Sequence, residues 1–177
     1  MPKRVSEYHG HAIFADSIAI TKRGQSVNSK RRQVGLNRPS IGLAERAAVN
    51  RVLRSGNLAQ GVTVGEFESA YSSYVSGAMC VALNSGTSAL HLALLALDIG
   101  PGDEVIVPTF TFAATANAAA ITGAKPVFVD IEGDYFGIHP DRVVDAITSR
   151  TKAVIAVHLY GHPAEMAKLK QICHKHG

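Results

Sequence analysis

From residue 79 onward, short apolar runs alternate with helical stretches, and this alternation constrains the fold more than any other feature. Strands and helices that alternate at a spacing of about 25 residues are typical of βαβ units. Continuous valine and isoleucine runs suit strands that are buried on both faces. We therefore expect an α/β fold with a mainly parallel sheet and helices on both faces. The predicted strands are 79–83, 104–107, 126–129 and 153–157, and the predicted helices are 88–97, 113–121, 140–147 and 163–176.

The chain before residue 79 has a different character. Residues 1–36 are polar and basic without a sustained period, and we interpret them as a basic, disordered leader. The organised part begins at residue 37. Ser40 is a candidate N-cap for a helix that ends near 55–57, and the sequence from Thr63 to Glu66 has the pattern of a capping box for a helix over 64–74. The predicted division is therefore a leader over 1–36 and one partial domain over 37–177.

Composition excludes several function classes. The 177 residues are 46% hydrophobic and 18% charged, which is typical of a globular chain with a sizeable core. The net charge of +4 is concentrated in the first 34 residues, so a basic domain face for nucleic acid is not indicated. No apolar run reaches the roughly 18 residues that a membrane span needs. Cys80 and Cys173 have no disulfide or metal spacing, which favours reduced thiols in the cytoplasm.

The turn around Gly86 is a candidate anion site. An apolar run leads into it, a strongly apolar helix leaves it, and Thr87 and Ser88 add hydroxyl groups. The first N–H groups of a helix have no intrahelical partner, and the helix dipole adds about half a positive charge there. Gly86 lets a bound group approach the backbone closely, and a phosphate is the natural occupant. The alternative interpretation is an ordinary capped helix after a buried strand.

A second loop belongs to the same region. Ligands of parallel α/β sheets bind beyond the carboxyl ends of the strands. That edge brings the Gly86 turn together with the loop over 108–112, which carries Phe110 and Phe112 beside two threonine hydroxyls. A flat aromatic ring there can cover the face of a planar cofactor. From composition alone, either phenylalanine is more often a core residue.

Several segments together resemble the DegT/DnrJ/EryC1/StrS aminotransferases. The matching segments, in order and spacing, are NSGTSALH (84–91), GPGDEVIVP (100–108), TFTFAATANA (109–118), PVFVD (126–130) and VHLYG (157–161). Members are pyridoxal-phosphate enzymes of the aspartate-aminotransferase type, fold type I, and most of them aminate keto sugars attached to nucleotides. The resemblance implies that the chain is the N-terminal portion of the large domain of that fold.

The resemblance also assigns roles to residues. It implies that Gly86, Thr87 and Ser88 hold the cofactor phosphate and that Phe112 stacks on the pyridine ring, which leaves Phe110 as the core candidate. The loop over 55–61 resembles a segment near the sugar substrate, but no single substrate-binding residue is assigned. The intact enzymes take a nucleotide sugar and an amino donor, act in amino-sugar or polysaccharide biosynthesis, and are typically homodimers.

Pyridoxal-phosphate chemistry also needs a lysine for the Schiff base and a carboxylate at the pyridine nitrogen. In the family both come after the segment that ends at residue 177. Lys125 and Lys152 lie at strand starts, at the edge opposite the ligand edge, and the lysines at 168, 170 and 175 lie on the last helix. We therefore expect a fragment truncated before the Schiff-base lysine, with no catalytic residue assigned and no activity alone.

Two alternatives stay open. The chain is a non-catalytic remnant that binds a phosphate-bearing ligand or a full-length partner, or it derives from a sugar dehydratase of the same family. The histidines, including His158 and His162, lack the ordered spacing of a zinc site, so no metal ligand is assigned.

Overall fold

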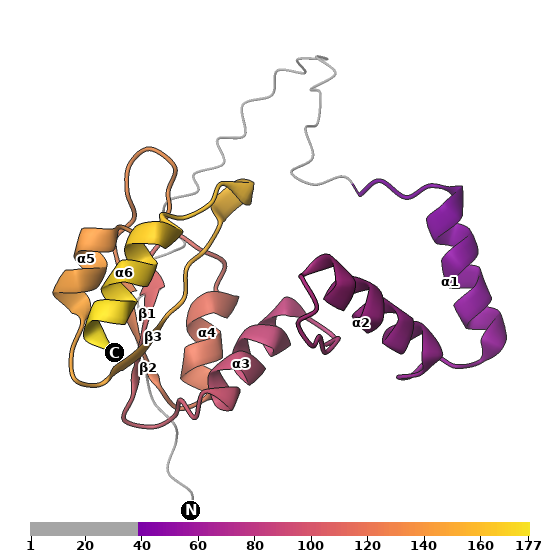
Figure 1. Ribbon diagram of the computed structural model, residues 1–177, viewed down its shortest axis with the longest axis horizontal. Helices are drawn as coiled ribbons and strands as arrows, with labels where there is room; N and C mark the ends of the chain where they lie inside the picture. Colours follow the sequence, from indigo (N-terminus) through magenta and orange to yellow (C-terminus); the bar gives the residue numbers. More distant parts are fainter. Residues whose placement is uncertain (1–38) are drawn as a thin grey trace, which may run out of the picture. The chain divides into compact units, whose positions relative to one another are not determined.

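The computed structural model describes residues 39–177, so the predicted leader over 1–36 lies outside the described residues (Figure 1). Six α-helices, three strands and one 3₁₀ turn are found in the described part. In chain order they are α1 (Leu43–Ser55), α2 (Val62–Tyr74), α3 (Gly86–Ala96), β1 (Glu104–Pro108), α4 (Ala114–Ile121), β2 (Lys125–Val129), α5 (Pro140–Ala146), β3 (Thr151–Val154), η1 (Leu159–Gly161) and α6 (Met166–His176).

The three strands form one parallel sheet in the order β2-β1-β3. Every residue of the middle strand β1 is buried, which is the environment that its continuous valine and isoleucine run predicts. Ile106 lies beside Val127 of β2 and Val154 of β3. The predicted parallel sheet is confirmed, although β3 begins and ends a few residues earlier than the predicted 153–157.

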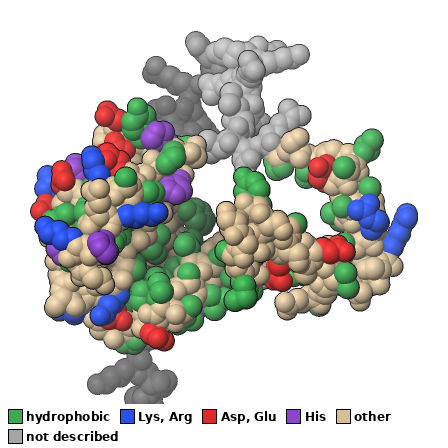
Figure 2. Space-filling view, viewed as in Figure 1, with side chains coloured by type: hydrophobic (Ala, Val, Ile, Leu, Met, Phe, Trp, Pro, Cys, Tyr) green, Lys and Arg blue, Asp and Glu red, His purple; other side chains and the backbone are tan. Residues whose placement is uncertain are grey.

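Alternate residues of β1 point to opposite faces of the sheet, and each face has its own core. On one face Val105 and Val107 pack with Leu94 of α3 and Ala118 of α4. On the other face Ile106 packs among residues of α5 and α6. Helices therefore cover both faces, as predicted (Figure 1). The outer side of the α3 and α4 layer stays apolar, and Figure 2 shows hydrophobic side chains gathered on the surface over these two helices.

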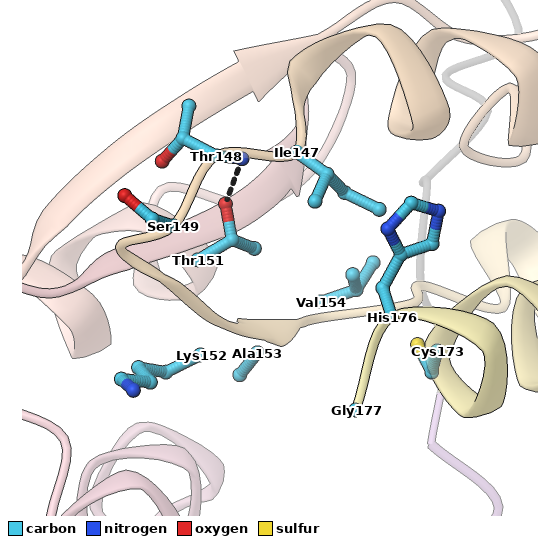
Figure 3. A pocket seen from close by; sticks show the side chains of 10 residues that line it. All are labelled: Ile147, Thr148, Ser149, Thr151, Lys152, Ala153, Val154, Cys173, His176 and Gly177. Atoms are coloured by element: carbon cyan, nitrogen blue, oxygen red, sulfur yellow. Dashed lines mark hydrogen bonds between the residues drawn. The ribbon is translucent and has the colours of Figure 1, made fainter.

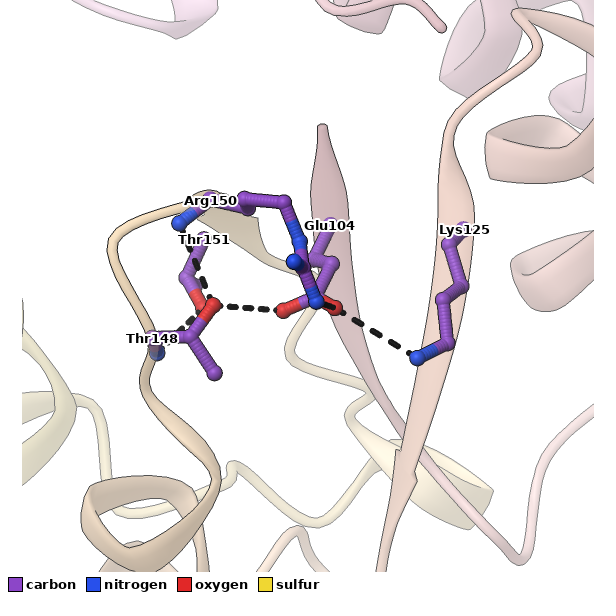
Figure 4. A network of polar contacts seen from close by, with 5 residues as sticks. All are labelled: Glu104, Lys125, Thr148, Arg150 and Thr151. Carbon is purple, nitrogen blue, oxygen red and sulfur yellow. Dashed lines mark hydrogen bonds and ion pairs between the residues drawn. The ribbon is translucent and has the colours of Figure 1, made fainter. Parts of the chain in front are cut away.

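Glu104, a buried carboxylate, ties the amino ends of the strands together (Figure 4). Its oxygens accept hydrogen bonds from the Thr148 hydroxyl (2.6 Å) and from the guanidinium of Arg150 (2.7 Å), and the Lys125 ammonium lies 3.4 Å away. The bonds from Thr148 and Arg150 lower the pKa of Glu104 to about 2. A charge that is held by this many donors can be buried without an unsatisfied partner.

The predicted strand over 79–83 is wrong, because the segment forms no strand in the structure. A strand needs a neighbouring strand for its N–H and C=O groups, and among residues 39–177 none pairs with this segment. Met79, Val81 and Leu83 of this segment are exposed, Met79 by 99%. Among the described residues, one hydrogen bond joins the segment to α2, from the Ala82 N–H to Glu68 Oε1 (2.8 Å). The apolar pattern is local, whereas strand pairing is not.

Two helices also begin at other residues than the sequence predicted. Helix α1 begins at Leu43 rather than just after Ser40, and the Gly42 N–H donates to the Glu45 side chain (2.7 Å). Helix α2 begins at Val62 with Gly61 as N-cap, so the predicted capping box at Thr63 is wrong. The Gly61 carbonyl already accepts the first helical bonds, which places Thr63 inside the first turn. No helix of the described part has the length and apolar composition needed to cross a membrane.

Candidate functional site

An open cavity of about 720 Å³ lies at the carboxyl ends of β1 and β3. After β1 the chain continues into α4 on one face of the sheet, and after β3 it continues into α6 on the other face. Neighbouring strands whose connections leave toward opposite faces open a crevice between them, where α/β sheets bind ligands. Three of the four predicted cofactor residues line this cavity, namely Gly86, Thr87 and Phe112. Tyr160 lines it as well.

The first turn of α3 contributes backbone donors to the cavity. Ser85 is the N-cap, and its Oγ accepts a hydrogen bond from the Ser88 N–H (3.1 Å). Within residues 39–177 the N–H groups of Gly86 and Thr87 have no acceptor, and Thr87 lies in the cavity wall. Two unpaired amides at the positive end of a helix are the donor set that an anion needs. The turn is a capped helix start that, in the described part of the chain, also has two free donors, and phosphate binding there stays a prediction.

Gly86 leaves room above this turn. A Cβ atom built on Gly86 would meet no atom within 4 Å, and the backbone there is outside the left-handed region. The fold itself therefore does not require glycine at this position. Ser88 behaves differently from its predicted role, because its hydroxyl donates to Asn84 Oδ1 (2.8 Å) inside the turn and the residue does not line the cavity. Its contribution to phosphate binding stays a prediction.

Phe112 projects into solvent at the mouth of the cavity, with 80% of the residue exposed. An exposed aromatic ring beside the first turn of a helix suits a ligand that carries a planar ring and a phosphate. Phe110 was the expected core residue, but it is 46% exposed and packs edge-on against Phe136, with ring centroids 6.0 Å apart. The core role of Phe110 is therefore wrong. Its ring stabilises the neighbouring loop instead.

The loop after β3 forms the facing wall. His158 Nδ1 accepts a hydrogen bond from the Ala164 N–H (3.1 Å), and His162 stacks on Tyr135 with ring centroids 4.0 Å apart. These contacts hold η1, where Tyr160 adopts a left-handed backbone (φ 51°) and lines the cavity. A tyrosine in that region is strained, and strain of this kind gathers at functional sites. Both histidines therefore have structural partners.

Glu132 organises the loop after β2. Its carboxylate accepts hydrogen bonds from the N–H groups of Gly137 (2.9 Å), Tyr135 (3.0 Å) and Asp134 (2.8 Å). These bonds, led by the one from Gly137, lower the pKa of Glu132. The carboxylate thus stays charged and fixes the loop that carries Tyr135 and Phe136. This loop supports the cavity from the side, and none of its residues lines it.

A second hollow, of about 250 Å³, lies at the amino end of β3 and the end of α6 (Figure 3). Lys152, Cys173 and His176 line it, but none of the predicted cofactor residues does. Lys125 pairs with Glu104 at the same edge of the sheet. Among the described residues, no lysine lines the cavity beside Gly86 and no group of three metal-ligating side chains converges.

The cavity wall also includes Tyr160, Thr111 and Thr115. The sequence pattern placed the hydroxyl of Thr111 at the ligand edge without a role of its own, and it did not indicate Thr115 or Tyr160 as site residues. The feature of the sequence that could have indicated Thr111 and Thr115 is their spacing of four residues. Hydroxyls at positions i and i+4 across a helix start can bond to one another, and Thr111 Oγ1 lies 2.8 Å from Thr115 Oγ1.

Comparison with known proteins identifies the family that the sequence motifs resemble. The model of the DegT/DnrJ/EryC1/StrS aminotransferase family matches residues 39–177. The UDP-2-acetamido-2-deoxy-3-oxo-D-glucuronate aminotransferase of Pseudomonas aeruginosa is 44% identical over 131 residues, which are 74% of this chain and 36% of that protein.

Solved structures agree with this match. DesV of S. venezuelae is 46% identical with a TM-score of 0.71, and the match covers 75% of this chain and 36% of that one. NtdA of Bacillus subtilis with bound cofactor PMP is 39% identical with a TM-score of 0.70, and the match covers 74% of this chain and 30% of that one. The chain thus spans about a third of the length of the relatives it matches.

Proposed function

Because the chain belongs to the DegT/DnrJ/EryC1/StrS aminotransferase family, we propose that it forms the cofactor-phosphate side of a pyridoxal-phosphate-dependent sugar aminotransferase. Residues 37–177 are then one part of the large domain of such an enzyme. The observation that carries the proposal is the cavity that joins two unpaired helix amides to an exposed aromatic ring.

Each residue has a role that follows from its chemistry. The N–H groups of Gly86 and Thr87 bind the phosphate, and the Thr87 side chain adds a hydroxyl beside them. Ser88 closes the turn through Asn84. Phe112 covers one face of the cofactor ring. The bound cofactor supplies an electron sink for amino transfer, which no protein side chain provides.

The substrate of the whole enzyme is a nucleotide-linked keto sugar, with a separate amino donor. The name of the Pseudomonas aeruginosa relative supports this choice, because it specifies a UDP-linked keto sugar acid as the acceptor. Amino-sugar and polysaccharide synthesis use such reactions. We further propose a homodimeric enzyme in the cytoplasm, where Cys80 and Cys173 stay reduced thiols.

The described lysines give this chain no anchor for the cofactor. Lys125 and Lys152 lie at the amino edge of the sheet, and the lysines of α6 lie outside the cavity. We propose that the 177-residue chain binds cofactor reversibly and does not transaminate by itself. Borohydride reduction of the chain with pyridoxal phosphate, followed by peptide mass spectrometry, should give no adduct at one preferred lysine. A single stoichiometric adduct would contradict this part of the proposal.

Binding itself is tested with pyridoxine 5′-phosphate. This compound has the ring and phosphate of the cofactor but an alcohol in place of the aldehyde, so it cannot react with lysine. A ¹H–¹⁵N NMR titration of the full chain should shift the amides of Gly86, Thr87 and Phe112 along one saturable curve. Pyridoxine without the phosphate should bind much more weakly. Shifts confined to other residues, or no saturation, would overturn the proposed site.

A further inference from the structure

We propose that Thr111 is a further ligand-contacting residue of this cavity and that the buried Thr115 positions its hydroxyl. The inference rests on the proposed function, because it concerns the same ligand. Both residues line the cavity together with Gly86, Thr87 and Phe112. Their Oγ1 atoms lie 2.8 Å apart, and either one can be the donor in that hydrogen bond.

Burial decides which hydroxyl donates. Thr115 is only 5% exposed, whereas Thr111 is half-buried at the cavity wall. The pair has two O–H groups, and their mutual bond uses one of them. If Thr111 were the donor, the O–H of Thr115, which lies at the cavity wall but is almost fully buried, would be left without a partner, which is the costly arrangement. Thr115 is therefore the donor, and the spare O–H belongs to Thr111.

The free O–H of Thr111 lies at the cavity wall, where it can donate a hydrogen bond to a ligand. Within residues 39–177, Thr115 is the one side-chain partner of the Thr111 hydroxyl. Phe112 follows Thr111 directly in the chain and lines the same cavity, as does the first turn of α3. A hydroxyl whose oxygen already accepts a bond on one side directs its own O–H away from that donor, so the O–H of Thr111 points away from Thr115. Thr111 thus offers one donor to an oxygen of a bound phosphate-bearing ring.

The backbone supports this division of roles. The Thr115 N–H donates to the Phe112 carbonyl (3.0 Å), so Thr115 lies in the first turn of α4 directly above the loop that holds Thr111. The loop, in turn, follows the fully buried strand β1. Thr115 does not need to touch the ligand, because it acts through Thr111, and it is a positioning residue.

The test measures the affinity of the full chain for pyridoxine 5′-phosphate and for inorganic phosphate in four variants. Thr111→Val should weaken pyridoxine 5′-phosphate about 10-fold, the loss of one charge-assisted hydrogen bond, or about 1.4 kcal/mol. Thr115→Val should weaken it less, and Thr115→Ser should restore it. Thr122→Val is the matched control, because it removes a hydroxyl at the other end of α4 that bonds to the Ala119 carbonyl. This control should leave affinity unchanged.

The double variant separates positioning from packing. If Thr115 acts only through Thr111, then Thr111→Val/Thr115→Val binds no more weakly than Thr111→Val alone. Additive losses would overturn the positioning role. Equal losses for inorganic phosphate and pyridoxine 5′-phosphate would identify a phosphate oxygen as the acceptor, and a loss for the second alone would identify a ring oxygen. Both outcomes support the contact.

Thermal unfolding without ligand tests the bond direction independently. Thr111→Val strands the buried Thr115 O–H, so it should lower Tm more than Thr115→Val, which leaves only the accessible Thr111 O–H unpaired. The reverse order would overturn the assigned direction. Unchanged affinity in Thr111→Val would overturn the contact alone. Failure of the unsubstituted chain to bind pyridoxine 5′-phosphate would overturn the contact and the proposed function together.

Discussion

Replacement of Gly86 by alanine separates the folding role of the Gly86 turn from its binding role. The added Cβ would meet no atom within 4 Å, and the backbone is outside the left-handed region, so the structure predicts no strain. Alanine is favoured over glycine inside a helix by about 1 kcal/mol, and the first helical position keeps part of that gain. The free energy of unfolding of Gly86→Ala should therefore stay equal or rise by less than about 1 kcal/mol.

Ligand binding should change in the opposite direction. Because Gly86 lines the cavity, the new methyl group would take up space beside the two unpaired amides, where we propose that the phosphate binds. Each charge-assisted bond contributes about 1.5 kcal/mol or more, so displacement from both amides costs about 3 kcal/mol. That loss corresponds to a rise of about 100-fold in Kd for pyridoxine 5′-phosphate.

The measurement combines urea unfolding with isothermal titration of pyridoxine 5′-phosphate. Gly65→Ala is the matched control, because this glycine lies inside α2, its Cβ would also meet nothing within 4 Å, and it does not line the cavity. The control should gain stability and keep its affinity. The reasoning is refuted if Gly86→Ala binds like the unsubstituted chain, or if it loses more than about 1 kcal/mol of stability.

Four further substitutions test the fold. The pKa of Glu104 is lowered to about 2 from 4.5, so its charge stabilises the fold above pH 4.5, and that contribution disappears as the pH falls toward 2. Urea midpoints measured across that range should therefore fall more steeply in the native chain than in Glu104→Gln. Parallel curves would contradict this. Ile106→Ala, in the fully buried middle strand, should cost about 2–5 kcal/mol by urea unfolding, and a cost under about 1 kcal/mol would disprove the packing. Ser85→Ala should lower the free energy of unfolding by about 1 kcal/mol, because Ser85 caps α3. Thr63→Ala should lower it by less than about 0.5 kcal/mol, because Gly61 occupies the cap of α2. Equal losses would argue against this assignment of the caps.

The sequence correctly predicted those strands and helices whose packing partners lie within the described residues 39–177. The valine and isoleucine run of β1 is buried by β2, by β3 and by helices on both sides of it in the chain, α3 before it and α4 to α6 after it. Periodicity therefore sufficed for the sheet and for both helical layers. The apolar run over 79–83 has an equally good pattern, but no strand of the described part pairs with it. A pattern of side chains cannot say whether a hydrogen-bonding neighbour is present.

The site followed the same logic. The free amides at the start of α3 were predictable, because a helix N-terminus after a glycine turn is a local arrangement, and phosphate binding to them stays a prediction. The choice between Phe110 and Phe112 depended on the resemblance, since both have the same composition and nearly the same position. Thr115 was not predictable as a positioning residue. Its meaning comes from burial and from the 2.8 Å contact with Thr111, and neither can be inferred from hydroxyl content alone.

The two walls of the cavity differ in how firmly the fold holds them. Thr111 and Phe112 lie between a fully buried strand and α4, so both ends of that wall are anchored in regular structure. The first turn of α3 follows the largely exposed segment over 79–83, which among the described residues is joined to α2 by one hydrogen bond, from the Ala82 N–H to Glu68 Oε1. Its position is therefore set by the packing of Leu94 against α4 rather than by strand pairing.

This asymmetry limits binding by the chain alone. Fixing the backbone of one residue costs about 1–2 kcal/mol of conformational free energy. A ligand that has to order the turn therefore binds more weakly by the free energy that this ordering costs. A strand paired to residues 79–83 would supply that order in advance and would raise affinity without touching the ligand. The cavity thus has its chemistry in place, and its strength depends on what covers the segment that leads into Gly86.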